Sequence, residues 1–228
     1  MRQDLLKQKS SVEIEQARKA TWERLVREVD EIADAKGTGV DEGIKETLVA
    51  LNAHGIKTRM SCEGHDDWGM GAPWIDAAAP DVPARRYIDE DIIFQRIAAK
   101  YSATVEDVKL DYNHEAWVEA MAVFETTEDT PEYKRWRAKT QRLFEKTTRF
   151  LAQFYAGRNV PLDVRLEIDQ SPSGIFRVHN GGEYFQPVPD DMPEEEKQAL
   201  RERLQRYQEE MRAFTRFLRE QYFGNKSK

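Results

Sequence analysis

The chain reads Thr58-Arg-Met-Ser-Cys-Glu-Gly-His-Asp-Asp-Trp-Gly-Met-Gly-Ala-Pro-Trp-Ile-Asp76 where a glycine-rich loop joins two expected short strands, residues 56–61 and 73–77. These nineteen residues hold the only cysteine, one of four histidines and two of five tryptophans. A loop that follows a strand exposes side chains to ligands while the strand holds them in position. The sequence therefore predicts that any functional site lies in this loop.

Helices are predicted on both sides of the loop, because apolar residues recur there every three or four positions. Asp41 is the expected N-cap of the helix that precedes the loop, and Gly55 is its expected C-terminal stop. The predicted helices span residues 4–35, 41–55, 88–101, 105–112, 115–126, 132–155 and 193–223.

Two further strands are predicted at residues 163–169 and 175–185. In the first of them, apolar and charged residues alternate from Val164 to Asp169, as in a strand with one buried face. The predicted fold is α+β and helix-rich, with a small mixed or antiparallel sheet surrounded by several helices and a long C-terminal helix. We expect a single domain over residues 1–228, with residues 1–36 and 193–228 as peripheral long helices.

Heptad-like apolar seams run along the last two predicted helices. Two seams of similar length are buried most economically against each other, in an antiparallel pair. The alternative is that the final seam joins a second copy of the chain in a homodimer. The seam residues are Trp136, Thr140, Leu143, Thr147, Phe150 and Phe154, and Leu200, Leu204, Tyr207, Met211, Phe214, Leu218 and Tyr222.

The composition excludes several classes of protein. Charged residues make up 34% of the chain, against roughly 25% in an average domain, which indicates long solvated helices. A net charge of −7 argues against general nucleic-acid binding, which needs a basic surface. No apolar run approaches the ~18–20 residues of a membrane span, the N-terminus shows no signal region, and one cysteine excludes an internal disulfide. We expect a soluble, cytoplasmic protein without a membrane partner.

Cys62 and His65 form the centre of the candidate site, with two reactive chemistries open. In a nucleophilic site, His65 would hold Cys62 as a thiolate, because a nearby imidazolium lowers the pKa of a thiol. Glu63 would then transfer protons as a third catalytic residue. In a metal site, Cys62 and His65 would bind zinc together with a carboxylate such as Asp66 or Asp76. His179, at the end of a neighbouring strand, would be a further metal ligand.

Binding without covalent chemistry is the third alternative. The indole rings of Trp68 and Trp74 can stack on a planar ligand, and Arg59 can neutralise an anion. Asp76 adds a carboxylate to the loop's end, and Arg177 joins the site if its strand face turns toward the loop. The plain structural alternative is that the cysteine is a small buried residue and the tryptophans anchor the core.

About twenty-five positions of the chain carry a resemblance to known families. They lie in Val40-Asp-Glu-Gly-Ile44, Leu51-Asn52, Gly55-Ile-Lys-Thr58 and Ser61-Cys-Glu-Gly-His65. The pattern resembles small uncharacterised bacterial proteins with an LN-x-x-G-I-x-T turn, an SCEGH loop and a P-W/Y-I/V-D strand. It is also similar to the tRNA wybutosine-synthesis methyltransferase family, which has arginine at the position of His65 and serine at that of Met60. The second resemblance implies tRNA modification with S-adenosylmethionine.

Three functions are therefore expected. The first is the binding or processing of a small polar or nucleotide-like ligand at the Cys62–Asp76 loop. The second is a helical protein–protein interaction module in which the loop is only structural. The third is a tRNA-modifying protein related to the methyltransferases.

Overall fold

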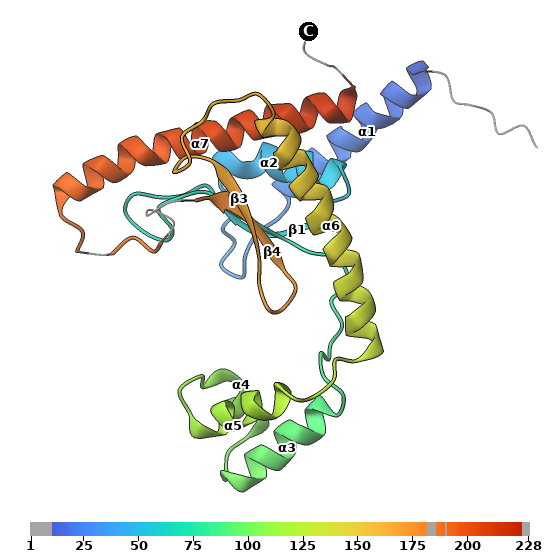
Figure 1. Cartoon of the computed structure of the whole chain (residues 1–228), viewed down its shortest axis with the longest axis vertical. Helices are drawn as coiled ribbons and strands as arrows, with labels where there is room; N and C mark the ends of the chain where they lie inside the picture. Colours follow the sequence, from blue (N-terminus) through green and yellow to red (C-terminus); the bar gives the residue numbers. More distant parts are fainter. Residues whose placement is uncertain (1–10, 182–185, 190, 225–228) are drawn as a thin grey trace, which may run out of the picture. The chain divides into compact units, whose positions relative to one another are not determined.

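The protein has the predicted helix-rich α+β fold (Figure 1). The computed structural model describes residues 11–181, 186–189 and 191–224. The parts of the predicted elements at residues 4–10 and 182–185 lie outside these ranges. The helices are α1 (Ser11–Asp30), α2 (Glu42–Ala53), α3 (Glu90–Lys100), α4 (Val105–Leu110), α5 (Glu115–Phe124), α6 (Pro131–Tyr155) and α7 (Glu194–Phe223), and the strands are β1 (Thr58–Cys62), β2 (Trp74–Ala77), β3 (Leu166–Gln170) and β4 (Phe176–Asn180).

The four strands form one antiparallel sheet in the order β1-β2-β4-β3. One face of this sheet is apolar and packs against helices. It contributes buried residues to the main core, to which α1, α2, α6 and α7 also contribute, and this burial is the chief stabilising term of the fold. The core residues of this face are Ile75, Ala77, Leu166, Phe176 and Val178.

The other face of the sheet is polar. Residues that pair across neighbouring antiparallel strands point to the same face. Cys62 on β1, Trp74 on β2, His179 on β4 and Glu167 on β3 are paired in this way and form one row across the sheet. The alternation read from the sequence is therefore correct, and most of the predicted site residues on strands share this face.

Helix α7 packs along α2, and the two helices lie side by side in Figure 1. The buried hydroxyls of Thr47 and Thr215 form a hydrogen bond of 2.7 Å between them. A hydrogen bond between two buried hydroxyls satisfies both groups away from water, which a polar pair in a core requires. The pair therefore links α2 to α7 within the core.

The predicted antiparallel pairing of the two long helices is observed only at the end of α6. Rings of α6 contact α7 near the end of α6, where Phe150 and Phe154 lie 6.5 and 5.6 Å from the ring of Phe217. Nearer its start, α6 uses Trp136 differently, because the indole Nε1 donates a hydrogen bond of 2.9 Å to the carbonyl oxygen of Ala79. Most seam residues of α7 are buried within the chain itself, so the seam offers no support for the expected homodimer.

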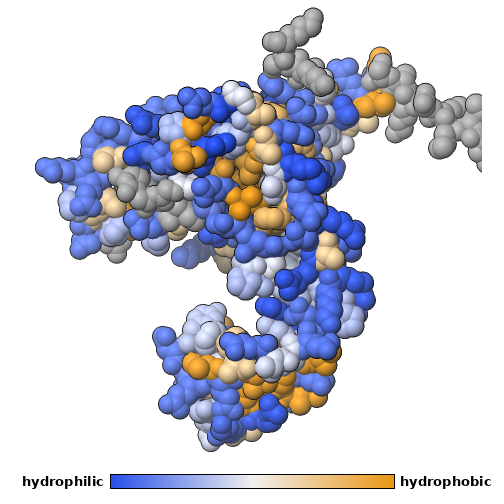
Figure 2. All heavy atoms as spheres, in the orientation of Figure 1, coloured by the Kyte–Doolittle hydropathy of each residue, from blue (hydrophilic) through white to orange (hydrophobic). Residues whose placement is uncertain are grey.

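The chain divides into two compact units where the sequence predicts one domain. Unit 1 contains the sheet and is built from residues up to Ala78 and from Arg142 onward, whereas unit 2 is Ala79–Gln141. Unit 2 has its own small core, in which Phe94 and Phe124 are buried. The surface of both units is mostly hydrophilic, with separate hydrophobic patches (Figure 2). Among the described residues, no helix is both long and apolar enough to cross a lipid bilayer.

Candidate metal centre and ligand cleft

Three side chains that can bind a metal ion meet where β1 ends. The carboxylate of Asp41, the thiol of Cys62 and the ring of His65 bring their ligand atoms within 4.8 Å of one another. Asp41 lies directly before α2, Cys62 is the last residue of β1, and His65 follows in the loop. Within the described ranges this is the one group of three such residues. The structure thus brings together Cys62 and His65, as predicted, and adds Asp41.

Gly64 creates the turn that places Cys62 and His65 on the same side of the loop. Its φ of +81° lies in the left-handed region, which glycine adopts without steric cost. The Gly64 backbone N–H donates to Cys62 Sγ over 3.3 Å. One residue later, the N–H of His65 donates to the carbonyl oxygen of Met70 over 2.9 Å and closes the loop. Local backbone geometry therefore orients both side chains.

Asp41 and Glu63 connect the loop to the start of α2. Asp41 occupies the predicted N-cap position of α2, but its side chain makes no capping hydrogen bond. Glu63 Oε2 instead accepts a hydrogen bond of 2.6 Å from the N–H of Gly43, in the first turn of that helix. The carboxylate of Asp41 accepts from the N–H of Glu63 over 3.0 Å, which holds it beside the loop. In this conformation the Glu63 carboxylate is bound to α2, not to the thiol or the imidazole.

The imidazole of His65 has a buried nitrogen without a hydrogen-bond partner among the described residues. This nitrogen, Nε2, lies 3.6 Å from Asp41 Oδ2, which is too far for a hydrogen bond. The ring is held by stacking on Trp68, with the two ring centroids 4.0 Å apart and an interplanar angle of 22°. A buried polar atom without a partner is costly, so this nitrogen calls for an additional bonding group.

Burial raises the pKa of the Cys62 thiol above its ordinary value, and the nearby carboxylate of Asp41 raises it further. The residue is only 8% exposed, and a low-dielectric environment disfavours the charged thiolate. The hydrogen bond from the Gly64 N–H opposes this effect without reversing it. Without a bound cation, Cys62 is therefore a neutral thiol at neutral pH.

A cleft of about 520 Å³ lies beside this group of residues, which is within the usual range for small-molecule sites. Its lining includes Cys62 and Asp41, so two of the three metal-binding side chains border the space. Arg59, Trp68 and Trp74, three of the predicted ligand-binding residues, line the same cleft. The remaining walls come from the turn between α1 and α2 and from β1. The glycine-rich loop thus forms one wall of this cleft.

Asp76 and Arg177, also predicted to bind ligand, do not line this cleft. They pair with each other across β2 and β4 through two hydrogen bonds of 2.6 and 2.8 Å. The bonds to Asp76 raise the pKa of the Arg177 guanidinium, which also stacks on the ring of Trp74 at 4.0 Å. This geometry is that of a bidentate structural ion pair on the polar face of the sheet.

His179, predicted as a metal ligand, does not belong to the group of Asp41, Cys62 and His65. Its ring is buried on the polar face, where Nε2 lies 2.9 Å from Asp169 Oδ2 and Nδ1 lies 2.9 Å from the carbonyl oxygen of Asn180. Both ring nitrogens therefore have oxygen partners of their own. The third member of the group, beside the thiol of Cys62 and the imidazole of His65, is the carboxylate of Asp41.

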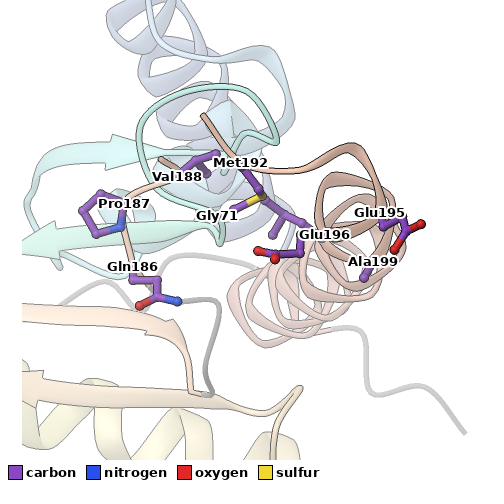
Figure 3. Close-up of a pocket in the computed structure, with 9 residues that line it drawn as sticks. Gly71, Gln186, Pro187, Val188, Met192, Glu195, Glu196 and Ala199 are labelled. Carbon is purple, nitrogen blue, oxygen red and sulfur yellow. The ribbon is translucent and has the colours of Figure 1, made fainter. Parts of the chain in front are cut away.

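A second hollow of about 430 Å³ lies between the start of α7 and the segment 186–188 (Figure 3). It is lined by Gly71, Met192, Glu196, Leu200 and neighbouring residues. No cysteine, histidine or basic residue is among the described residues that line it. Of the two hollows, only the first is bordered by residues of the group of Asp41, Cys62 and His65.

Nothing in the spacing of the sequence points to Asp41 as a partner of Cys62, because the two are brought together only by the packing of α2 against β1.

Comparisons of the chain with protein-family models, with curated proteins and with solved structures find no match. The resemblances to the SCEGH proteins and to the tRNA methyltransferase family stay predictions.

Proposed function

We propose that this protein binds one zinc ion through Asp41, Cys62 and His65 and uses the ion to hold a small polar ligand in the adjoining cleft. The observation that carries the proposal is the convergence of the three ligand atoms within 4.8 Å at the wall of the cleft. A carboxylate, a thiol and an imidazole together are a ligand set typical of zinc.

The separation between His65 Nε2 and Asp41 Oδ2 supports this proposal. Two atoms that bind one zinc ion at about 2.0–2.1 Å with a tetrahedral angle lie about 3.3–3.4 Å apart. The observed separation of 3.6 Å is close to this value and too long for a direct hydrogen bond. An ion at that point would also satisfy the buried Nε2, which has no hydrogen-bond partner among the described residues.

The sulfur of Cys62 requires a small adjustment. Separations of up to 4.8 Å in the group must shorten to about 3.6 Å for a tetrahedral ion with a zinc–sulfur bond of about 2.3 Å. Rotation about the Cα–Cβ bond moves a sulfur atom by this amount. A zinc ion with three protein ligands keeps a fourth position, where it acts as a Lewis acid toward a bound molecule. Because Asp41 and Cys62 both line the cleft, that position would face it.

We predict a zinc-to-protein ratio of one, with removal of His65 or Asp41 weakening zinc binding at least about 100-fold. That estimate follows because even partners outside the first coordination sphere change metal affinity by about 10–100-fold. Competition with a chromophoric chelator measures the affinities of the His65→Ala and Asp41→Ala variants. Replacement of zinc by cobalt(II) gives a second readout, since a thiolate–cobalt absorption band appears only if Cys62 is a ligand.

His179→Gln is the matched control for these variants, because it removes a buried imidazole outside the group. We expect it to keep the zinc affinity of the parent protein within about twofold. Circular dichroism of every variant separates loss of the site from loss of the fold. Zinc bound equally well by His65→Ala and by the parent protein would overturn the proposal.

The competing nucleophile hypothesis makes the opposite prediction about Cys62. In protein freed of metal by a chelator, burial keeps the thiol protonated, since it raises the pKa of Cys62. We expect alkylation by iodoacetamide at pH 7 to be slower than that of a small free thiol, and to accelerate only at pH values above about 8.5, the ordinary pKa of cysteine. Rapid alkylation below pH 7 that is lost in His65→Ala would favour the nucleophile instead.

A further inference from the structure

The walls of the cleft beyond the three metal-binding side chains are mostly apolar. Three large apolar side chains on its lining are exposed to solvent: Ile32 at 48%, Met60 at 63% and Trp68 at 57%. They come from three separate segments, the turn after α1, strand β1 and the glycine-rich loop. Single exposed apolar residues are normal, but several that meet around one cavity mark a binding surface. The deeper wall is also apolar, with Leu48 and Trp74 buried.

Three charged residues line the cleft, and two of them, Asp34 and Asp41, form hydrogen bonds with the protein backbone. Asp34 accepts hydrogen bonds from the N–H groups of Lys36 and Thr38 over 2.8 and 2.9 Å, so it stabilises the turn. Asp41 accepts from the backbone after β1 and faces His65. The guanidinium of Arg59 forms no hydrogen bond or ion pair with any described residue. The charged group of the cleft that is left to bind a ligand is therefore the positive guanidinium of Arg59.

We infer that the cleft binds a small amphipathic carboxylate, with its apolar body between Ile32, Met60 and Trp68 and its carboxylate on Arg59. One guanidinium matches one carboxylate through two parallel hydrogen bonds. A phosphate dianion would carry more charge than Arg59 neutralises and would face Asp34 and Asp41 in the same cavity. This inference names the ligand class of the proposed function, but it depends on the cleft and on Arg59, and not on the metal alone.

Three probes test the inference by isothermal titration calorimetry on zinc-loaded protein. They are 3-phenylpropanoate, propanoate, which lacks the apolar body, and 3-phenylpropan-1-ol, which lacks the charge. We expect 3-phenylpropanoate to bind at least about tenfold more tightly than either control, since burial of a ring and a charge-assisted hydrogen bond are each worth at least that factor. Equal affinities for the three probes, or no binding of any of them, would overturn the inference.

Variants assign the two parts of the ligand. Arg59→Gln should remove the preference for the carboxylate over the alcohol, whereas Met60→Ser should weaken both ring-bearing probes and leave propanoate unchanged. Arg212→Gln, at an exposed position of α7, is the matched control and should leave all three affinities unchanged. A preference for the carboxylate that survives in Arg59→Gln would contradict the assignment of the anion site.

Zinc content measured on the same samples keeps this inference separate from the proposed function. Bound zinc without binding of 3-phenylpropanoate contradicts the ligand class and leaves the metal proposal intact. Binding of 3-phenylpropanoate to protein without zinc affinity supports the cleft and contradicts the metal proposal. The two proposals therefore fail independently.

Discussion

Replacing Gly64 by alanine is expected to lower the free energy of unfolding by about 2–5 kcal/mol and to weaken zinc binding. Two costs add. The φ of +81° disfavours any residue with a Cβ, by about 1–2 kcal/mol. A Cβ would also lie 2.7 Å from the side chain of Leu204 and 2.8 and 2.9 Å from backbone atoms of Ala72 and Pro73, and overpacking of this kind costs about 1–3 kcal/mol. Because two of those atoms belong to the backbone, the loop itself must move.

Gly55→Ala provides the matched control for this prediction. Gly55 has a similar φ of +75°, but a Cβ there would meet no atom within 4 Å. We therefore expect it to lose only the backbone cost of about 1–2 kcal/mol and to keep the zinc affinity of the parent protein. Urea unfolding followed by circular dichroism gives the free energies, and chelator competition gives the affinities. Equal losses of unfolding free energy in the two variants would mean that the close contacts of a Cβ at position 64 do not destabilise the protein.

Replacing Arg158 by methionine is expected to cost about 3–5 kcal/mol of stability, because it leaves the carboxylate of Glu210 buried without the guanidinium that neutralises its charge. The side chain of Glu210 is only 7% exposed. Its two oxygens accept hydrogen bonds of 3.0 and 2.9 Å from the guanidinium of Arg158, which also stacks on Phe154 at 3.9 Å. Methionine retains most of the apolar contact, so the loss reports chiefly on the charge.

Two comparisons isolate that charge. In the double variant Arg158→Met/Glu210→Gln the buried charge is gone, and we expect much of the lost stability to return. Arg24→Met removes one partner of the exposed pair Arg24–Glu28 and should cost less than about 1 kcal/mol. Urea unfolding measures all three. A loss below about 1 kcal/mol for Arg158→Met alone would show that water reaches Glu210 in the folded protein.

Local patterns in the sequence predicted the type and approximate position of every described helix and strand, although the first helix, expected to reach residue 35, ends at Asp30. The last helix, expected at residues 193–223, is observed at Glu194–Phe223, and the strand expected at 56–61 is Thr58–Cys62. These elements follow from apolar periodicity and from glycines at their ends, and both signals act over a few neighbouring residues. The alternation in the third strand likewise predicted one buried and one polar face of the sheet.

The candidate site was predicted only in part, for the same physical reason. Cys62 and His65 are neighbours in the chain, so their spacing and Gly64 between them already brought them close. Asp41, by contrast, looks like an ordinary helix cap, and His179 looks like a metal ligand at the end of a strand. Which of the two reaches the thiol depends on how α2 and β4 pack against β1, and no local pattern encodes that.

The chain alone therefore carried the type and position of its secondary structure and the location of its reactive loop, since short-range contacts decide both. Only the folded structure placed Asp41, and not His179, beside the thiol, packed α7 against α2 and bound Glu63 to the start of a helix. It also left the guanidinium of Arg59 in the cleft without a partner among the described residues. Each of these results depends on contacts between segments far apart in the chain. Such contacts are set by the packing of whole elements around the core.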